Sequence, residues 1–232
     1  MAFADHPTLH PANWLRDLQA QVPRKLARDY WNRLRFGPEA PQSDECVYVD
    51  PGRTHFSYDP KAARRKLRRS HSGMVLGGDW DRCRRPLDSH VKIASVRERY
   101  LGGVPWEQTA LFDKLLREIR DGHHPDGLES RKELVQRYEV LDRVFEETRR
   151  RGRLLTRAEL PEFFRREHGG ILVHIDREGA PMRAGGGMHR FAIAKVLELP
   201  EIPAQLGVVH PQALRAGLLA PLRQSLAART AA

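Results

Sequence analysis

Residues 185–199 read Gly-Gly-Gly-Met-His-Arg-Phe-Ala-Ile-Ala-Lys-Val-Leu-Glu-Leu, three glycines that lead straight into an apolar helical segment. Glycine carries no side chain, so the backbone N–H groups of this turn can approach an anion closely. The residues that follow begin the helix, beside the positive end of its dipole. The same glycines would also let a helix pack tightly against a strand, and this alternative stays open. The pattern predicts a site for the phosphates of a nucleotide, formed by Gly185, Gly186, Gly187, Met188, His189 and Arg190.

The segments around this glycine turn (residues 185–187) predict strands on both sides of it. Upstream, residues 171–176 are typical of a strand, residues 177–179 of a tight turn and residues 181–184 of a short return strand. Downstream, Pro200 ends the helix, and residues 202–209 form another apolar run. The predicted order is therefore hairpin, glycine turn, helix, strand.

This order resembles the ParB/sulfiredoxin superfamily, over residues 160–210. The resemblance is carried by residues 186–190 (Gly-Gly-Met-His-Arg) and by residues 201–204 (Glu-Ile-Pro-Ala). It implies a small mixed β-sheet that holds a nucleotide polyphosphate at the turn. With the helices expected elsewhere in the chain, the predicted fold class is α+β, a ParB/sulfiredoxin-like sheet with a large helical insertion and N-terminal helices.

Within that superfamily the residues of the turn separate three branches. Sulfiredoxins place their catalytic cysteine where this chain has Met188, and a thioether cannot form the thiol-based intermediate that reduction of a sulfinic acid requires. ParB partition proteins carry a Glu-Arg-Arg version that binds CTP, and the glutamate is absent here. The free-serine kinases of archaea use Gly-His-His-Arg, of which Gly187, His189 and Arg190 are kept. The resemblance is thus closest in logic to the kinase branch, and sulfiredoxin activity is not expected.

A second stretch of chemical interest follows a short apolar run at residues 74–76, which is expected to be a strand. Residues 77–81 read Gly-Gly-Asp-Trp-Asp, so Asp79 and Asp81 stand on either side of Trp80. Two carboxylates on a turn suit coordination of Mg²⁺, and one of them suits the role of general base toward a substrate hydroxyl. The alternative is a hydrogen-bonded turn whose tryptophan fills the core. Asp79 and Asp81 are the candidate catalytic and metal-binding residues.

Composition limits the class of protein. With 232 residues, 40% hydrophobic residues and four tryptophans, the chain is expected to fold as one domain with a large insertion or as two small ones. Its two cysteines give no disulfide framework, and no Cys/His spacing resembles a zinc site. Residues 1–20 lack the apolar core of a signal peptide, and no apolar run reaches the roughly 18 residues of a membrane span. We expect a soluble, cytoplasmic protein.

The formal net charge of +10 favours contact with polyanions. Basic residues gather at 61–69, 82–85, 149–153 and 165–166. Glutamates interleave with most of these arginines, which is typical of solvated helix faces, but the run 61–69 contains no acidic residue. We therefore expect at most weak contact with a polyanion or a membrane surface through the basic patches, and specific nucleic-acid binding is less favoured.

Residues 12–36 predict one or two amphipathic helices that are broken or kinked at Pro23. A basic helix of this kind either docks on the protein's own core, which is the commoner case, or lies on a membrane surface. Its apolar face carries Trp14, Leu15, Leu18 and Val22, then Leu26, Tyr30, Trp31 and Leu34.

Further helices are expected at residues 106–121 and 129–151. Thr156 and Glu159 suggest a capping box that opens a helix ending at His168, and a basic helix is expected within residues 212–229. The predicted organisation is 1–45 as N-terminal helices and linker, 46–91 as the first part of the core with a strand at 46–50, 92–168 as the helical insertion, 169–211 as the nucleotide-binding core and 212–232 as C-terminal helix and tail.

These residues favour nucleotide-dependent phosphoryl transfer to a hydroxyl of a small-molecule, lipid-linked or glycan substrate, with ATP or another nucleotide and Mg²⁺ as cofactors. The glycine turn would hold the phosphates, and Asp79 or Asp81 would carry the metal or accept the hydroxyl proton. One alternative is a ParB-like nucleic-acid-binding protein, acting as a nuclease or nucleotide switch, with residues 61–69 on the backbone. The other is a non-catalytic nucleotide-binding module. The kinase mechanism requires that the two aspartates and the glycine turn lie side by side.

Overall fold

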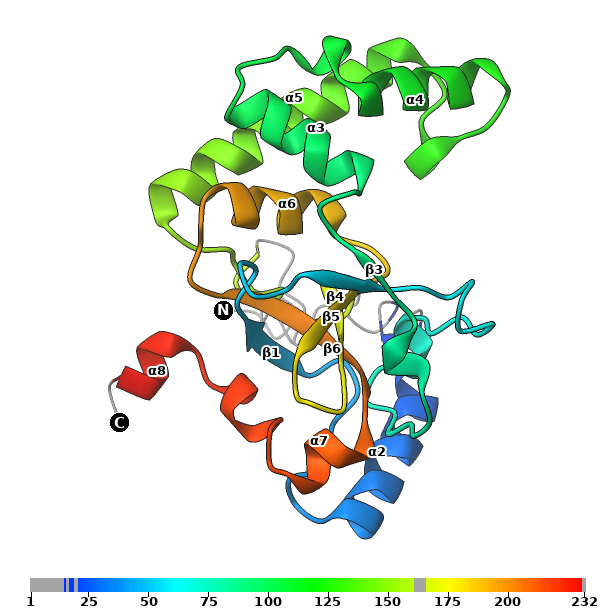
Figure 1. The fold of residues 1–232 in the computed structure, drawn as a ribbon, viewed down its shortest axis with the longest axis vertical. Coiled ribbons are helices and arrows are strands. Elements are labelled where there is room, and N and C mark those ends of the chain that lie inside the picture. The colour runs from blue at the N-terminus through cyan, green and yellow to red at the C-terminus, as the bar shows by residue number, and fades with distance from the viewer. Residues whose placement is uncertain (1–14, 16, 19–20, 161–165, 231–232) are drawn as a thin grey trace, which may run out of the picture. The chain divides into compact units, whose positions relative to one another are not determined.

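The computed structural model describes residues 15, 17–18, 21–160 and 166–230 of the chain. It confirms an α+β fold, with a six-stranded mixed sheet, a helix before the sheet and a helical segment in the middle of the chain (Figure 1). No helix within the described ranges is long and apolar enough to cross a bilayer.

The chain divides into two compact units, each built from segments that are distant in the sequence. The helical unit takes Leu87–Leu154 together with Met188–Leu199, so the helix after the glycine turn belongs to it. The sheet unit contains the glycine turn itself and comprises Met1–Pro86, Leu155–Gly187 and Pro200–Ala232, as far as these are described.

The sheet has the strand order β1-β6-β4-β5-β2-β3. Strand β6 is second from one edge and is buried at all eight positions. It lies between β1, which is antiparallel to it, and β4, which is parallel. A strand covered on both faces is mainly apolar along its length, as β6 is apart from Gln205, and this is why the sequence predicts it. The strands predicted at 46–50, 171–176, 181–184 and 202–209 are confirmed, and the full set is β1 (Cys46–Val49), β2 (Phe56–Tyr58), β3 (Arg84–Pro86), β4 (Leu172–Ile175), β5 (Pro181–Ala184) and β6 (Ile202–Val209).

The parallel pairing of β4 with β6 is interrupted at His174. The register shifts between Val173 and Ile175, because β6 uses one residue more than β4 over this stretch. The N–H of Val208 donates to Nδ1 of His174 at 3.0 Å. Gly207 lies against the imidazole, and a Cβ there would be 2.2 Å from Nδ1. The side chain of His174 therefore takes the place of a backbone acceptor inside the sheet, and only glycine fits beside it.

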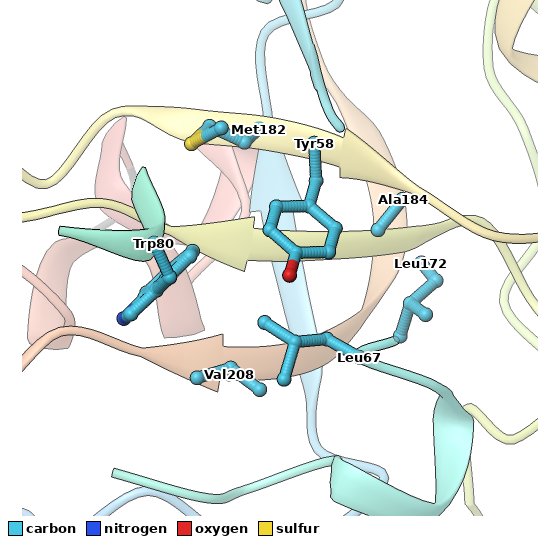
Figure 2. Packing of buried hydrophobic residues seen from close by; sticks show 7 residues of the cluster. All are labelled: Tyr58, Leu67, Trp80, Leu172, Met182, Ala184 and Val208. Atoms are coloured by element: carbon cyan, nitrogen blue, oxygen red, sulfur yellow. The ribbon is translucent and has the colours of Figure 1, made fainter. Parts of the chain in front are cut away.

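An apolar cluster forms around Tyr58 and Trp80 (Figure 2). The rings of Tyr58, Trp80 and His174 meet edge to face, with centroids 5.4, 5.8 and 6.1 Å apart. Contacts of this geometry each add about 0.5–1.5 kcal/mol beyond the area they bury. The cluster joins strands β2, β4, β5 and β6 to two loops through Tyr58, Leu67, Trp80, Leu172, Met182, Ala184 and Val208.

The sheet unit also holds the helix α2 (Val22–Phe36) and the short helices α7 (Pro211–Arg215) and α8 (Leu226–Thr230). Pro23 lies in the first turn of α2, where its missing N–H costs nothing. Where one short helix and a tail were expected within residues 212–229, the structure has two short helices. Gly217, with φ of +70°, follows the end of α7, and a 3₁₀ turn at Ala220–Arg223 precedes α8.

The helical unit confirms the helices predicted at 106–121 and 129–151. The first is divided, because Thr109 ends a 3₁₀ turn at Trp106–Gln108 and caps the next helix by accepting the N–H of Phe112. Ser130 caps the second in the same way through Glu133. The α-helices of the helical unit are α3 (Val91–Tyr100), α4 (Ala110–Arg120), α5 (Arg131–Arg151) and α6 (Met188–Val196).

Two expected elements differ from the structure. Residues 74–76 form no strand, and only Val75 makes an isolated bridge, to Val209. The expected helix from Thr156 to His168 is a turn in its described parts, and residues 161–165 lie outside the described ranges. Both the N–H and Oγ1 of Thr156 donate to Glu159 Oε2, at 2.9 and 3.0 Å, so the local bond predicted from the sequence forms without a helix.

Candidate nucleotide site

The glycine turn follows β5 and has a backbone shape that only glycine adopts without strain. Gly185 and Gly187 have φ of +50° and +80°, whereas Gly186 between them has no positive φ. A Cβ on Gly187 would lie 3.1 Å from Cα of Ile171, so this glycine also allows close packing against the start of β4. Gly185 and Gly186 are exposed, and a ligand can reach them.

Arg183 is fully buried and holds the glycine turn from within the sheet unit. Its Nη2 donates to the carbonyl oxygens of Gly185, at 2.9 Å, and of Gly186. The C=O and N–H of a trans peptide point in opposite directions, so the N–H groups of Gly186 and Gly187 point away from this guanidinium. Neither N–H donates to any acceptor in the described part of the chain. Successive free N–H groups on residues whose φ alternates in sign form a concavity that binds anions.

Arg69 brings a second guanidinium to the turn. Its Nη2 would lie 2.7 Å from a Cβ on Gly186, and it donates to the carbonyl of Gly170 at 2.6 Å. Burial and, to a smaller extent, the nearby charge of Arg69 lower the pKa of Arg183 to about 9. Both side chains stay protonated at neutral pH, so a bound anion would offset their repulsion. The sequence placed Arg69 in a basic run more than a hundred residues away and gave no signal for this role.

The chain enters the helical unit at Met188, and there His189 packs against Tyr138. The two rings are 5.8 Å apart, edge to face, and His189 Nε2 lies 3.5 Å from the tyrosine hydroxyl. Burial lowers the pKa of His189 to about 4, and neighbouring basic residues add to this effect. Its imidazole is therefore neutral at pH 7 and brings no positive charge to a phosphate. Met188 and Arg190 are half-buried, and their contact with a phosphate stays a prediction.

The two predicted catalytic aspartates are held by Arg177, in the turn between β4 and β5. Its Nε and Nη2 lie 2.7 and 2.6 Å from the two carboxylate oxygens of Asp81, and Nη2 lies 2.7 Å from Asp79 Oδ1. These bonds keep the pKa of Asp79 below its usual value, and for Asp81 they outweigh the burial that would raise it. Trp80 between them is buried and donates to Leu76 O at 2.8 Å. Arg177 thus joins the turn between β4 and β5 to the loop that carries the two aspartates, and Trp80 of that loop lies in the core.

The structure does not bring these aspartates to the glycine turn. Gly185 lies against Leu172, the first residue of β4, whereas Asp81 binds Arg177, beyond the end of that strand. The strand alone spans about 10 Å at 3.3 Å per residue, and Figure 2 shows Trp80 and Leu172 at opposite ends of it. One metal ion cannot bridge that separation. Within the described ranges no group of three or more His, Cys, Asp or Glu side chains is arranged to hold a metal, and Mg²⁺ binding at Asp79 and Asp81 stays a prediction.

A buried polar network, which the sequence did not predict, ends beside the glycine turn. Lys25 and Asp44 are 1% and 3% exposed and form an ion pair at 2.7 Å. Gln205 donates to Asp44 Oδ1 at 2.6 Å and accepts a hydrogen bond from Arg69 through its own oxygen. His168 Nδ1 lies 3.3 Å from the same carboxylate. The network therefore connects α2 to the guanidinium that touches Gly186.

A cavity of about 880 Å³ lies in the sheet unit, and Asp44 is part of its wall. Its volume is within the usual range for small-molecule sites. Leu26 and Tyr30 of α2 line one side, and Glu167 lines another. Because Asp44 also belongs to the buried network, the cavity is linked to the glycine turn by two intervening side chains.

The two cysteines, Cys46 and Cys83, are both free thiols. Burial raises the pKa of Cys46 to about 12, so its thiolate is scarce at neutral pH. Neither residue lies in the glycine turn, and the lack of sulfinic-acid reduction stays a prediction.

No protein-family model matches this chain, and comparisons with curated proteins and with solved structures returned no match either.

Proposed function

We propose that the sheet unit binds a nucleotide through its phosphates at the glycine turn. The observation that carries this proposal is the pair of N–H groups of Gly186 and Gly187, which point away from Arg183 and donate to no described acceptor. The adjacent guanidinium of Arg69 supplies the positive charge that His189 does not. ATP is the first ligand to test, beside ADP, CTP and GTP, because the turn itself recognises phosphate and not the base.

Replacing Arg69 by methionine, or Gly186 by alanine, is expected to weaken nucleotide binding by about 1.5–3 kcal/mol, the range for a hydrogen bond to a charged group. The alanine acts because its Cβ would lie 2.7 Å from Arg69 Nη2 and must displace it. Gly77→Ala is the matched control, since its Cβ would make an ordinary contact of 3.6 Å with Pro211. Calorimetry with the four nucleotides measures the change.

Unchanged affinity in both Arg69→Met and Gly186→Ala would remove the glycine turn from the site. Failure of the intact protein to bind any of the four nucleotides would remove the proposal itself. Arg190→Ala, measured in the same series, tests whether the first turn of α6 contributes to the phosphate contact.

Phosphoryl transfer to a hydroxyl-bearing substrate is a second proposal, and its carboxylate is Glu167, not Asp79 or Asp81. Glu167 is only 4% exposed, and its Oε1 would lie 2.6 Å from a Cβ on Gly170, the residue whose carbonyl accepts Arg69. It lines the cavity, where an acceptor hydroxyl would find room. A general base must reach the proton that it removes, and the place of Glu167 in the cavity wall supports this role for a substrate bound there.

Glu167→Gln is expected to lower nucleotide turnover about a hundredfold while nucleotide affinity stays within a few-fold. Hydrolysis of each nucleotide, with and without Mg²⁺, is the measurement, and Glu159→Gln on the exposed turn nearby is the control. Equal turnover in Glu167→Gln and in the unaltered protein would leave the glycine turn as the site of a non-catalytic binding module.

A further inference from the structure

The helix α2 is inverted, because its polar side chains face the protein. Lys25 and Asn32 are buried on it, Lys25 in the ion pair with Asp44 and Asn32 as donor to two backbone carbonyls at 3.0 and 2.7 Å. Asp29 accepts both the N–H and the hydroxyl of Ser43, at 2.8 and 2.7 Å. The helix is therefore attached to the sheet unit mainly by hydrogen bonds and an ion pair. Of the apolar side chains of α2 that were expected to dock on the core, Val22 is buried, but the four that follow it are exposed.

The opposite side of α2 carries large apolar side chains into solvent. Leu26, Tyr30, Trp31 and Leu34 are 53%, 68%, 62% and 64% exposed. The exposed positions of this helix are otherwise Pro23, Ala27 and three arginines, Arg24, Arg33 and Arg35, with no acidic residue among them. The helix α2 is drawn in blue in Figure 1.

This face is unusual for the surface of a folded protein. A surface helix normally turns its apolar stripe inward, and contiguous exposed apolar patches mark interaction sites. Leu15 and Leu18, just before α2, are 59% and 67% exposed, so six of the ten large hydrophobic side chains found exposed in the described chain lie within residues 15–34. The remaining four are scattered through the two units.

We propose that this face of α2 docks onto a membrane surface that carries anionic lipid. At 100° per residue, the exposed apolar stripe spans about 140° of the helix and consists of Leu26, Tyr30, Leu34 and Trp31. Arg33 lies at one border of this stripe, and Arg24 and Arg35 lie at the other. Tryptophan and tyrosine beside leucine, bordered by cations, form the face that an interfacial helix inserts among headgroups. The inward polar bonds hold the helix so that its apolar side stays available.

The borders of the stripe favour anionic lipid over a second copy of this chain. An isologous contact places the same patch of two copies face to face, so arginines would meet arginines with no carboxylate on either face. Anionic headgroups instead attract each of the bordering cations. The cavity shares Leu26 and Tyr30 with α2, so docking would also bring its rim to the lipid surface. The proposal does not depend on nucleotide binding at the glycine turn.

Sedimentation with vesicles tests the proposal on the full chain. The protein is expected to bind vesicles of phosphatidylcholine with about 30% phosphatidylglycerol at roughly 0.1 M salt, and to bind pure phosphatidylcholine much more weakly. Trp31→Gln/Leu34→Gln should lower the vesicle partition coefficient at least about tenfold, since binding scales with buried apolar area. The matched control is Leu101→Gln in the helical unit, where a leucine that is 70% exposed is replaced and binding should not change.

Three outcomes would overturn the proposal. The first is no binding of the unaltered protein to anionic vesicles. The second is equal binding by Trp31→Gln/Leu34→Gln, which would assign the attraction to the basic patches alone. The third is a dimer in light scattering that the same double variant dissociates, which would identify a second copy as the occupant. Quenching of tryptophan fluorescence by brominated lipid, present in the unaltered protein and reduced in Trp31→Phe, gives an independent readout of insertion.

Discussion

Asp44→Asn is expected to lower the free energy of unfolding by about 3 kcal/mol, because it leaves the charge of Lys25 buried without its partner. The two side chains are 1% and 3% exposed and their closest atoms are 2.7 Å apart. Hydrogen bonds from His168 and Lys25 hold the pKa of Asp44 below its usual value, although burial alone would raise it. Asp44 is therefore ionised at neutral pH. Burial lowers the pKa of Lys25, and the bond to the Asp44 carboxylate opposes this shift. The loss of the pair is measured as a lower urea midpoint.

Asparagine is the informative replacement because it changes the charge and little else. Asp44 has φ of +56°, a left-handed conformation that asparagine also tolerates, so no new backbone strain enters. The amide oxygen still accepts the hydrogen bond that Gln205 donates at 2.6 Å. Any loss of stability can then be assigned to the unpaired ammonium of Lys25.

The double variant Lys25→Met/Asp44→Asn should recover at least half of that loss. Methionine fills the volume of the lysine stem and carries no charge, and an apolar replacement of a buried ion pair is often close to neutral. A double variant as unstable as the sum of the two single variants would contradict this reading, because residues joined by a real interaction do not add.

The strands, the long helices and the fold class could be predicted because local patterns specify them. The run at 202–209 is apolar except for Gln205 and becomes β6, which is buried at all eight positions. Ser130 and Gly152 stand at the two ends of α5, where one accepts the N–H of Glu133 and the other adopts φ of +69°. In each case the residues that determine the element are neighbours in the sequence.

The site could not be predicted to the same depth, because its side chains meet only in three dimensions. Arg69 lies against Gly186, although more than a hundred residues separate them in the sequence. Arg183 occupies an ordinary position in β5, and nothing in the pattern of that strand shows that its side chain binds the carbonyls of the glycine turn. The pair Asp79 and Asp81 carried the chemistry expected of a metal site, but its partner, Arg177, came from a hairpin turn. A basic residue in a turn gives no sign of the carboxylates that it will bind.

The inverted helix shows a further limit. The spacing of Leu26, Tyr30 and Leu34 correctly predicted an amphipathic helix, but periodicity does not say which face is inward. The inward face is determined by Lys25, which pairs with Asp44, and by Asn32, which donates to two backbone carbonyls.

The stability of the protein is expected to fall as the pH drops from about 6.5 to 4. Burial lowers the pKa of His174 to about 3, with the charge of Arg183 as a smaller cause, and burial lowers the pKa of His189 to about 4. In the unfolded chain both histidines take up a proton near pH 6.5. Between these values the unfolded state binds more protons, so the stability contributed by each neutral imidazole is complete above pH 6.5 and is lost as the pH falls toward the folded pKa.

Each histidine should contribute a slope of roughly 1 kcal/mol per pH unit in this window, and the two lie in different units of the structure. His174→Asn isolates one of them, because the asparagine oxygen can still accept the N–H that Val208 donates to His174 Nδ1 at 3.0 Å. Urea unfolding at pH 6 and pH 5 gives the change in the free energy of unfolding of the sheet unit with pH. In His174→Asn this change should correspond to about one proton fewer taken up on unfolding than in the unaltered protein. His189→Asn should change the slope for the helical unit alone. A slope that His174→Asn leaves unchanged would mean that His174 already binds its proton in the folded sheet, and the edge-to-face packing with Tyr58 and Trp80 would then have to accommodate a buried imidazolium.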